Sequence, residues 1–425
     1  MRRNARARNN RKKIYSDIDF NKTRKFLIII VGILAVIFIA VITFSTLKNH
    51  QEYKNLINTS KNEIEKQNDE ENKETENQNS SSEETDTTFT LSAIGNILCN
   101  STLTKDAYIK SNNSYDFSYI FNNINSYTKL ADICVGNLET TFSGSDKGFL
   151  NSSKLNAPDE LSQELKHIGV DVLSTSSMHS LDFGYDGLSR TIDTLNSADV
   201  SHLGTYNSSE SQDKVLIKYA KGVKIAFLNF TYGNTNLKLP TDKNYCVNLY
   251  SEDFAKKQID IAKSKSADVI VTCMNWTNVK ESKQQEIADF LFKNGVNVIL
   301  GSGPQSLQKM EKRTVTLDDN STKDGFIIYS LGNFLVDSNE ETYKNSIILN
   351  LSITKHSNRE ITIDKTDYKP IYISKDSNNS SQKFKIIDIN KIIYNYDNHI
   401  DTSITDKFYN SMKTKSNEIN KLLNP

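Results

Sequence analysis

Short apolar runs alternate with longer polar stretches from Phe89 onward. Seven of these runs are rich in Ile, Val and Leu and are predicted to be strands: 90–96, 131–139, 170–176, 223–230, 267–276, 296–303 and 325–334. Two of the polar stretches carry helix signals, because 157–169 has Pro158 in its first turn and both 157–169 and 282–295 end on glycine. This alternation predicts an α/β domain.

The pattern changes near the end of the chain. Residues 345–357 and 359–374 have the period of two antiparallel strands joined as a hairpin. Residues 376–425 are predicted to form a C-terminal extension with a polar spacer and one amphipathic helix. The main domain is therefore predicted to span 88–375.

One long uncharged apolar run, 26–47, precedes the domain. It is long enough to cross a hydrocarbon core of about 30 Å, so it is predicted to be a transmembrane helix. Residues 1–25 hold ten Lys and Arg against two Asp, which predicts a basic cytoplasmic head. The alternative is a cleaved signal peptide, whose apolar region is usually about 7 to 15 residues long.

Residues 48–87 are rich in Asn, Glu, Ser and Thr and are predicted to be a disordered tether. Together these segments predict a single-pass protein of the cell membrane, with a cytoplasmic N-terminus and an extracytoplasmic main domain. The cell membrane is thus one predicted partner, since anionic lipid suits a basic juxtamembrane segment.

Charge and cysteine content narrow the range of functions. The chain has 52 basic and 52 acidic residues, and this balance argues against a nucleic-acid partner, which requires a concentrated basic face. The four cysteines are widely spaced without a C-x-x-C pair. They are predicted to be small buried residues rather than zinc ligands.

Nearly every predicted strand ends in polar residues. They are Asn96, Asn137, Glu139, Ser176, Ser177, His179, Asn229, Asn275, Trp276, Ser302 and Asn333. Ligands of open α/β sheets bind outside the carboxyl ends of the strands, so these residues predict one convergent polar pocket. Asp182 closely follows His179 and is predicted to orient it. The alternative is that Asn and Ser at strand ends only start turns.

Six segments in one order resemble the CapA-type proteins associated with poly-gamma-glutamate capsule synthesis. The segments are "AIGNIL", "DICVGNLETTFSG", the run from Leu155 to Thr205, "VIVTCMNWTN", "VILGSGPQSLQKME" and "IIYSLGNFLVD". The resemblance covers about Thr88 to Ile373. It implies a calcineurin-like metallophosphatase-type β-sandwich flanked by helices, with a helix after the loop at Pro304.

Several positions depart from the family pattern that this resemblance implies. Where the family has metal-ligating Asp or His, or the middle Asn of Asn-Asn-His, this chain has Asn96, Met178, Asn275, Ser302 and Gln305. The retained positions are Asn137, Glu139, His179, Asp182, Trp276, Pro304, Glu311 and Asn333.

These departures change the expected chemistry. A two-metal site needs several anionic or imidazole ligands, and amides and hydroxyls bind divalent transition metals weakly. Glu139 and His179 are the weak metal candidates that remain, so no cofactor is expected. The alternative is a single Mg²⁺ or Ca²⁺ held by Glu139, Asn96 and waters, since hard cations accept these oxygens. Trp276 is predicted to pack at the pocket rim.

Three functions follow as hypotheses. The first is a membrane-anchored protein that takes part in synthesis, export or anchoring of an extracellular anionic polymer such as poly-gamma-glutamate, without metal-dependent catalysis. The second is an active metal-dependent hydrolase of phosphoester or gamma-glutamyl bonds. The third is a purely structural partner of other membrane proteins in a capsule complex. The first is favoured, mainly through the resemblance.

Overall fold

The computed structural model describes residues 85–149, 154–233, 237–376, 379 and 381–424. Every described residue belongs to the second of two units of the chain, Glu83–Pro425, which is compact. The predicted head 1–25, the predicted spanning segment 26–47 and most of the tether 48–87 lie outside the described residues.

The predicted localisation requires correction. Within the part of the chain that the structure describes, no helix combines the length and apolar character of a bilayer span. The longest helix there, α12 (Asp406–Leu423), carries six charged side chains. This finding contradicts the prediction of a single-pass cell-membrane protein with an extracytoplasmic main domain.

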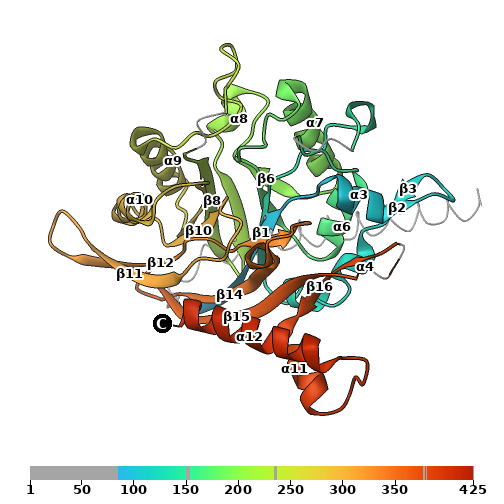
Figure 1. Cartoon of the computed structure of the whole chain (residues 1–425). Helices are drawn as coiled ribbons and strands as arrows, with labels where there is room; N and C mark the ends of the chain where they lie inside the picture. The colour runs from blue at the N-terminus through green and yellow to red at the C-terminus, as the bar shows by residue number, and fades with distance from the viewer. Residues whose placement is uncertain (1–84, 150–153, 234–236, 377–378, 380, 425) are drawn as a thin grey trace, which may run out of the picture. The chain divides into compact units, whose positions relative to one another are not determined.

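Two sheets form the centre of the second unit (Figure 1). The first has the order β16-β15-β14-β1-β4-β5-β6, and β13 also pairs with β1. Its strands are β1 (Thr87–Ile97), β4 (Ile133–Leu138), β5 (Val172–Ser174), β6 (Ser201–Leu203), β13 (Asn333–Leu335), β14 (Asn345–Lys355), β15 (Ile361–Lys375) and β16 (Phe384–Asp388). Strands β1, β4, β5 and β6 run parallel, and β14, β15 and β16 form an antiparallel meander.

The second sheet has the order β11-β12-β10-β9-β8-β7. Its strands are β7 (Leu216–Ala220), β8 (Val223–Thr231), β9 (Val269–Asn275), β10 (Val298–Ser302), β11 (Met310–Thr316) and β12 (Thr322–Ile328). The four central strands are parallel and the two edge strands are antiparallel to their neighbours. A separate two-stranded ribbon pairs β2 (Tyr108–Ile109) with β3 (Ser114–Tyr115).

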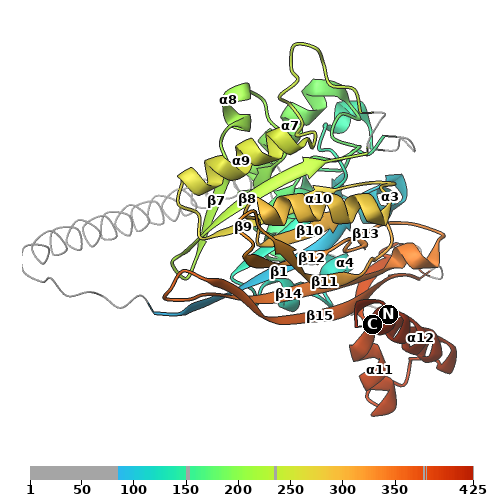
Figure 2. The same ribbon diagram turned by 90° about the vertical axis from the view of Figure 1, so that its left-hand side faces the viewer.

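Helices cover the outer faces of both sheets. The α-helices before the C-terminal extension are α3 (Ser101–Ala107), α4 (Ser118–Phe121), α5 (Asn125–Thr128), α6 (Glu160–His167), α7 (Gly184–Ser197), α8 (Ser209–Gln212), α9 (Glu252–Ser264) and α10 (Glu281–Lys293). Short 3-10 turns span Ser145–Lys147 and Glu341–Lys344. Figure 2 shows α9 and α10 lying along the second sheet.

The core has three main layers because the central strands are buried on both faces. One cluster joins the facing sides of the two sheets, with Leu91 and Ile133 from the first sheet packed with Phe227 and Val271 from the second. A second cluster lies between the first sheet and α3, α4 and α6, and a third lies between the second sheet and α9 and α10. The fold is therefore a sandwich of two sheets flanked by helices, which confirms the predicted α/β class.

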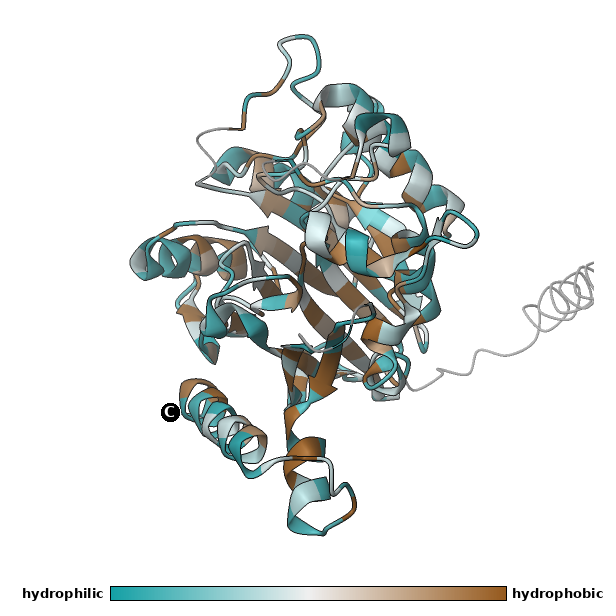
Figure 3. Ribbon diagram, turned by 45° about the vertical axis from the view of Figure 1, so that its right-hand side comes forward, coloured by the Kyte–Doolittle hydropathy of each residue, from teal (hydrophilic) through white to brown (hydrophobic). Residues whose placement is uncertain are grey.

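The C-terminal extension differs from its prediction of one helix. It contains β16 and two helices, α11 (Ile389–Asp397) and α12. The stretch "FKIID" forms a strand because it pairs antiparallel with the end of β15, and Asp388 then caps α11 by accepting from the backbone N–H of Lys391 at 3.0 Å. Figure 3 shows brown, apolar residues concentrated in the sheets and teal, polar residues along α12.

Candidate functional site

The parallel strands bring several of the predicted residues to one place. In the first sheet, Asn96 at the end of β1 is in register with Asn137 of β4 and with Asn333 of β13. In the second sheet, Asn275 at the end of β9 is in register with Ser302 at the end of β10. The side chain of Asn275 bonds Glu139, which follows β4, so the carboxyl ends of strands from both sheets meet, as the strand-end pattern predicts.

Asn96 connects the two sheets through both ends of its side-chain amide. Its Nδ2 donates to the Asn333 Oδ1 at 3.1 Å and to the carbonyl of Pro304 at 3.2 Å. Its Oδ1 accepts from Asn137 Nδ2 at 3.0 Å and from the backbone N–H of Gly303 at 3.2 Å. An aspartate carboxylate could accept but not donate, so it would leave the oxygens of Asn333 and Pro304 without this donor. The amide at position 96 is matched to its neighbours.

Glu139 is the carboxylate inside this group of amides, and its side chain is almost completely buried. Its Oε1 accepts from Asn137 Nδ2 at 2.9 Å and also from Asn275 Nδ2. Burial raises the pKa of the Glu139 carboxyl, and the charge of His179 and the hydrogen bonds from Asn137 and Asn275 oppose this only in part. Asn137 thus links Glu139 to Asn96, since its Nδ2 donates to both side chains, while Asn275 joins Glu139 to the second sheet.

His179 and Asp182 form a pair beside the buried amides. The His179 Nδ1 lies 2.9 Å from Asp182 Oδ2, and the same oxygen accepts from the backbone N–H of Leu155 at 2.6 Å. Their side chains are 19% and 13% exposed, whereas Asn96 and Asn275 are fully buried. Burial lowers the pKa of His179, but the hydrogen bond to Asp182 and the charges of Glu139 and Asp182 raise it more, so the net shift is upward.

Trp276 lies in the core rather than at a pocket rim. Its side chain is fully buried among the residues between the second sheet and its helices. Its Nε1 donates to the carbonyl of Tyr329 at 2.7 Å, and its ring stacks on the Tyr329 ring with 6.2 Å between centroids. Trp276 is therefore a packing residue that holds the end of β9 in place.

The loop after β10 is held tightly although it lacks imidazoles. Ser302 is buried and its Oγ donates to the carbonyl of Met274 at 3.3 Å, while Gln305 is exposed. Gly303 has φ +94°, and a Cβ there would lie 2.8 Å from Thr277 Oγ1 and 3.0 Å from Asn275 Oδ1. The loop therefore needs glycine to approach β9 this closely.

The helix expected after Pro304 is not formed. Strand β11 begins at Met310 and pairs antiparallel with β12, which places Glu311 opposite Ile327. Glu311 accepts from the hydroxyl of Tyr329 at 2.7 Å and from Arg313 at 3.2 Å, so it lies on a sheet edge away from the strand-end amides. Pairing with β12 outweighs the helical propensity of "SLQKME".

Two further strand residues contact this group: Ser174, which was not predicted, and Asn229, which was among the predicted strand-end residues. Ser174, at the end of β5, donates its Oγ to Asn137 Oδ1 at 2.8 Å. Its position follows from parallel register, because Asn137 pairs with Ser174 across β4 and β5. Asn229, inside β8, joins the second sheet to the first, since its Oδ1 accepts from the backbone N–H groups of Thr175 and Ser176, which follow β5, at 3.1 and 2.8 Å.

We define the amide–carboxylate network as Asn96, Asn137, Glu139, Asn275 and Asn333. The network is chemically unsuited to two metal ions. Its oxygens Asn96 Oδ1 and Glu139 Oε1 each already accept two hydrogen bonds. Among the described residues, no group of three or more His, Cys, Asp or Glu side chains is arranged to hold a metal ion. The residues present do not fit the two-metal site that the family resemblance implies.

The raised pKa of His179 gives a testable pH dependence. A raised folded-state pKa adds stability below the unfolded-state pKa, and this is lost as pH rises through the folded-state value. Burial lowers the pKa of His202, so the contribution of His202 to folding stability has the opposite pH dependence. It is present at high pH and is lost as pH falls. In urea titrations at about pH 5.5 and 8.5, we expect His179→Gln to destabilise more at the lower pH.

His202→Gln is the matched control for this measurement. Its destabilisation should be smaller at the lower pH, because wild-type His202 is already unfavourable there. If both variants changed the pH slope in the same direction, the assigned environment of His179 would be incorrect.

Comparisons with known proteins agree with the sequence resemblance. Residues 90–338, more than half of the chain, match the family model described as bacterial capsule synthesis protein PGA_cap. The chain is 27% identical over 248 residues to the capsule biosynthesis protein CapA of Bacillus anthracis, covering 56% of this chain and 58% of that protein. It is 25% identical over 312 residues to the PGA biosynthesis protein CapA of Bacillus subtilis, covering 69% and 76%.

The chain thus spans less than two thirds of the first of these relatives. Among solved structures, a 5′-nucleotidase precursor from Thermus thermophilus is similar at 13% identity with a TM-score of 0.42, covering 67% of this chain and 54% of that one. A likeness this distant carries no conclusion about activity. The family match does not depend on it: the chain belongs to the bacterial capsule synthesis protein PGA_cap family.

Proposed function

We propose that this protein takes part in the synthesis, export or anchoring of an anionic capsule polymer of the poly-gamma-glutamate type, and that it does so without metal-dependent catalysis. Family membership and the capsule and PGA biosynthesis relatives support the polymer. In this proposal the protein binds or guides the polymer, and the strand ends maintain the scaffold instead of supplying a reaction centre.

The observation that carries the non-catalytic part is the environment of Glu139. Its Oε1 accepts hydrogen bonds from Asn137 and Asn275, and its side chain is almost completely buried. A metal ion bound by this oxygen would displace the hydrogen bonds from Asn137 and Asn275. The network contains no other carboxylate that could accept them. Amides cannot replace the missing anionic and imidazole ligands.

One observation favours the hydrolase alternative. His179 is partly exposed, and its Nδ1 is held by Asp182, an arrangement that commonly orients a metal-ligating or proton-transferring imidazole. A hydrolase would use the other ring nitrogen of His179, Nε2. It would still require further ligands beyond those in the amide–carboxylate network.

Binding and turnover by the full chain separate the two functions. Purified protein is titrated with poly-gamma-glutamate in calorimetry, once with chelator and once with added Mn²⁺ or Zn²⁺. The polymer and a generic phosphodiester are then assayed for hydrolysis under both conditions. We expect polymer binding that is unchanged by chelator, and no turnover above that of buffer.

The variant His179→Ala and its control His399→Ala, which replaces an exposed imidazole in the C-terminal extension, complete the design. Metal-dependent turnover that His179→Ala abolishes and His399→Ala preserves would overturn the non-catalytic proposal. Absence of polymer binding under every condition would overturn the polymer-binding role.

A further inference from the structure

A second polar cavity lies at the opposite end of the second sheet from the amide–carboxylate network. Its volume is about 750 Å³, within the range of small-ligand sites. It is lined by residues at the amino ends of β9, β10 and β12, by the end of α9 and by the start of β15. The network lies instead at the carboxyl ends of β9 and β10, so the two places are separate.

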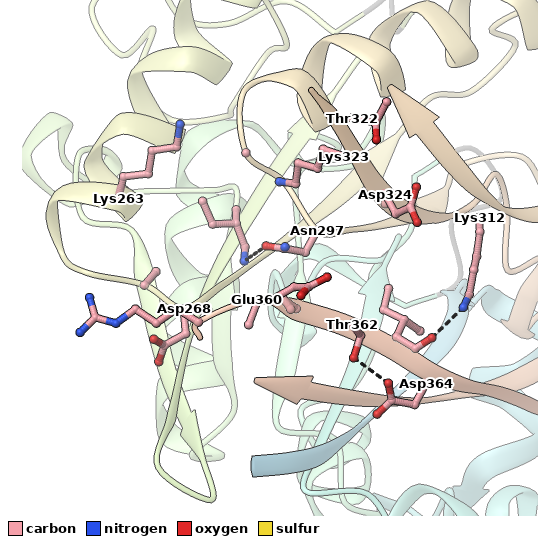
Figure 4. A pocket seen from close by; sticks show the side chains of 17 residues that line it. Lys263, Asp268, Asn297, Lys312, Thr322, Lys323, Asp324, Glu360, Thr362 and Asp364 are labelled. Atoms are coloured by element: carbon pink, nitrogen blue, oxygen red, sulfur yellow. Dashed lines mark hydrogen bonds between the residues drawn. The ribbon is translucent and has the colours of Figure 1, made fainter. Parts of the chain in front are cut away.

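Two lysines from different elements converge on one point of this cavity. Lys323 of β12 donates its Nζ to the carbonyl of Val296 at 2.8 Å. Lys263 of α9 lies against the preceding residue, because a Cβ on Gly295 would be 3.1 Å from the Lys263 Nζ. Figure 4 shows both lysines extending from the side of the cavity formed by the second sheet and α9. Two ammonium groups therefore flank Gly295 and Val296.

These ammonium groups have no carboxylate partner among the described residues. Neither Lys263 nor Lys323 forms an ion pair there, whereas Asp268 in the same lining is paired with Lys355 at 2.8 Å. Burial, and then the nearby charge of Lys263, lower the pKa of Lys323 to about 8. Unneutralised positive charge is thus concentrated at one end of the cavity.

The opposite wall of the cavity carries both acidic and basic groups. It comes from the hairpin between β14 and β15, where Glu360, Thr362 and Asp364 line the cavity (Figure 4). Asp364 accepts from Thr362 Oγ1 at 2.6 Å, and Arg359 of this hairpin and Lys312 of β11 also line the cavity. A ligand with an oxyanion near Lys263 and Lys323 would therefore meet both acidic and basic groups on this wall.

We propose that Lys263 and Lys323 form a binding site for a small ligand that carries an oxyanion group, a carboxylate or a phosphate. The oxyanion accepts from both ammonium groups, and the hydroxyl and charged groups of the opposite wall contact the rest of the ligand. The site is independent of the proposed polymer function. The alternative is that each lysine only complements the negative carboxyl-terminal end of α9 or α10.

Titration calorimetry of the full chain tests the site with two separate probes, inorganic phosphate and the dicarboxylate glutarate. We expect at least one probe to bind wild-type protein, and Lys263→Met to weaken that binding about tenfold or more, which corresponds to about 1.4 kcal/mol. Lys263 is exposed and forms no ion pair within the described chain, so this variant keeps the test independent of folding. Which probe binds distinguishes a phosphate ligand from a carboxylate ligand.

Lys293→Met is the matched control, because Lys293 is an exposed lysine in the last turn of α10 that does not line the cavity. It should bind the probe as wild-type protein does, and Lys323→Met should weaken binding as Lys263→Met does. Equal binding by wild-type protein and Lys263→Met would overturn the proposal, and so would equal weakening by Lys293→Met. If neither probe bound to wild-type protein, the proposal would also be overturned.

Discussion

Replacement of Gly95 by alanine should destabilise the domain by about 3 kcal/mol or more, at the upper end of overpacking effects. A Cβ at Gly95 would lie 2.2 Å from the carbonyl oxygen and 2.8 Å from the carbonyl carbon of Gly332. The neighbouring backbone cannot withdraw easily, because the N–H of Asn96 donates to this same oxygen at 2.9 Å. Relief of the clash would therefore separate β1 from the start of β13.

Urea unfolding of Gly95→Ala and of Gly222→Ala provides the comparison. Gly222 lies in the turn between β7 and β8 with φ +83°, and a Cβ there would meet no atom within 4 Å. Its replacement should cost only about 1 kcal/mol of backbone strain. Equal destabilisation by the two variants would mean that the contact between Gly95 and Gly332 is looser than described.

Truncation of Glu139 to alanine should destabilise the domain by about 3 kcal/mol, since it leaves buried donors without an acceptor and creates a cavity. The donors are Asn137 Nδ2 and Asn275 Nδ2, which both bond Glu139 Oε1. Removal of a desolvated carboxylate recovers part of this cost, because the pKa of Glu139 is raised by burial. The loss of hydrogen-bond acceptors nevertheless dominates.

Glu139→Gln keeps a hydrogen-bond acceptor at this position and removes the negative charge. A glutamine amide oxygen can still accept from Asn137 and Asn275, so its cost should be about 1 kcal/mol or less. Equilibrium unfolding in urea at neutral pH gives both values. Equal destabilisation by Glu139→Gln and Glu139→Ala would contradict this explanation. It would mean that the attraction between the charges of Glu139 and His179 stabilises the network, and that the hydrogen bonds to Glu139 do not.

The strand-end residues show what a sequence can reveal about such a site. Their convergence followed from alternating strands and helices, because parallel strands end at the same edge of a sheet. Asn96 and Asn137 indeed meet, at 3.0 Å between side-chain amides. Whether the place is open or filled could not be predicted, because it depends on how closely the second sheet brings Asn275 and Pro304 to the first.

The incorrect predictions have a common physical origin in pairing between distant segments. The stretch "SLQKME" has helical propensity, but Glu311 lies in β11 because β12 offers an antiparallel partner. The stretch 384–388 was assigned to a polar spacer, yet it forms β16 against the end of β15. Trp276 was placed at a rim because it follows a strand end, but its indole N–H donates to the Tyr329 carbonyl inside the core. Tertiary partners decide such segments.

The metal content of the full chain tests most directly the proposal that the amide–carboxylate network holds no metal ion. The protein is equilibrated with excess Mn²⁺ or Zn²⁺, passed through gel filtration and measured by elemental analysis, alongside His179→Ala and Glu139→Gln. We expect far less than one bound ion per chain in all three proteins. One or two ions per chain in wild-type protein, lost in both variants, would contradict the account.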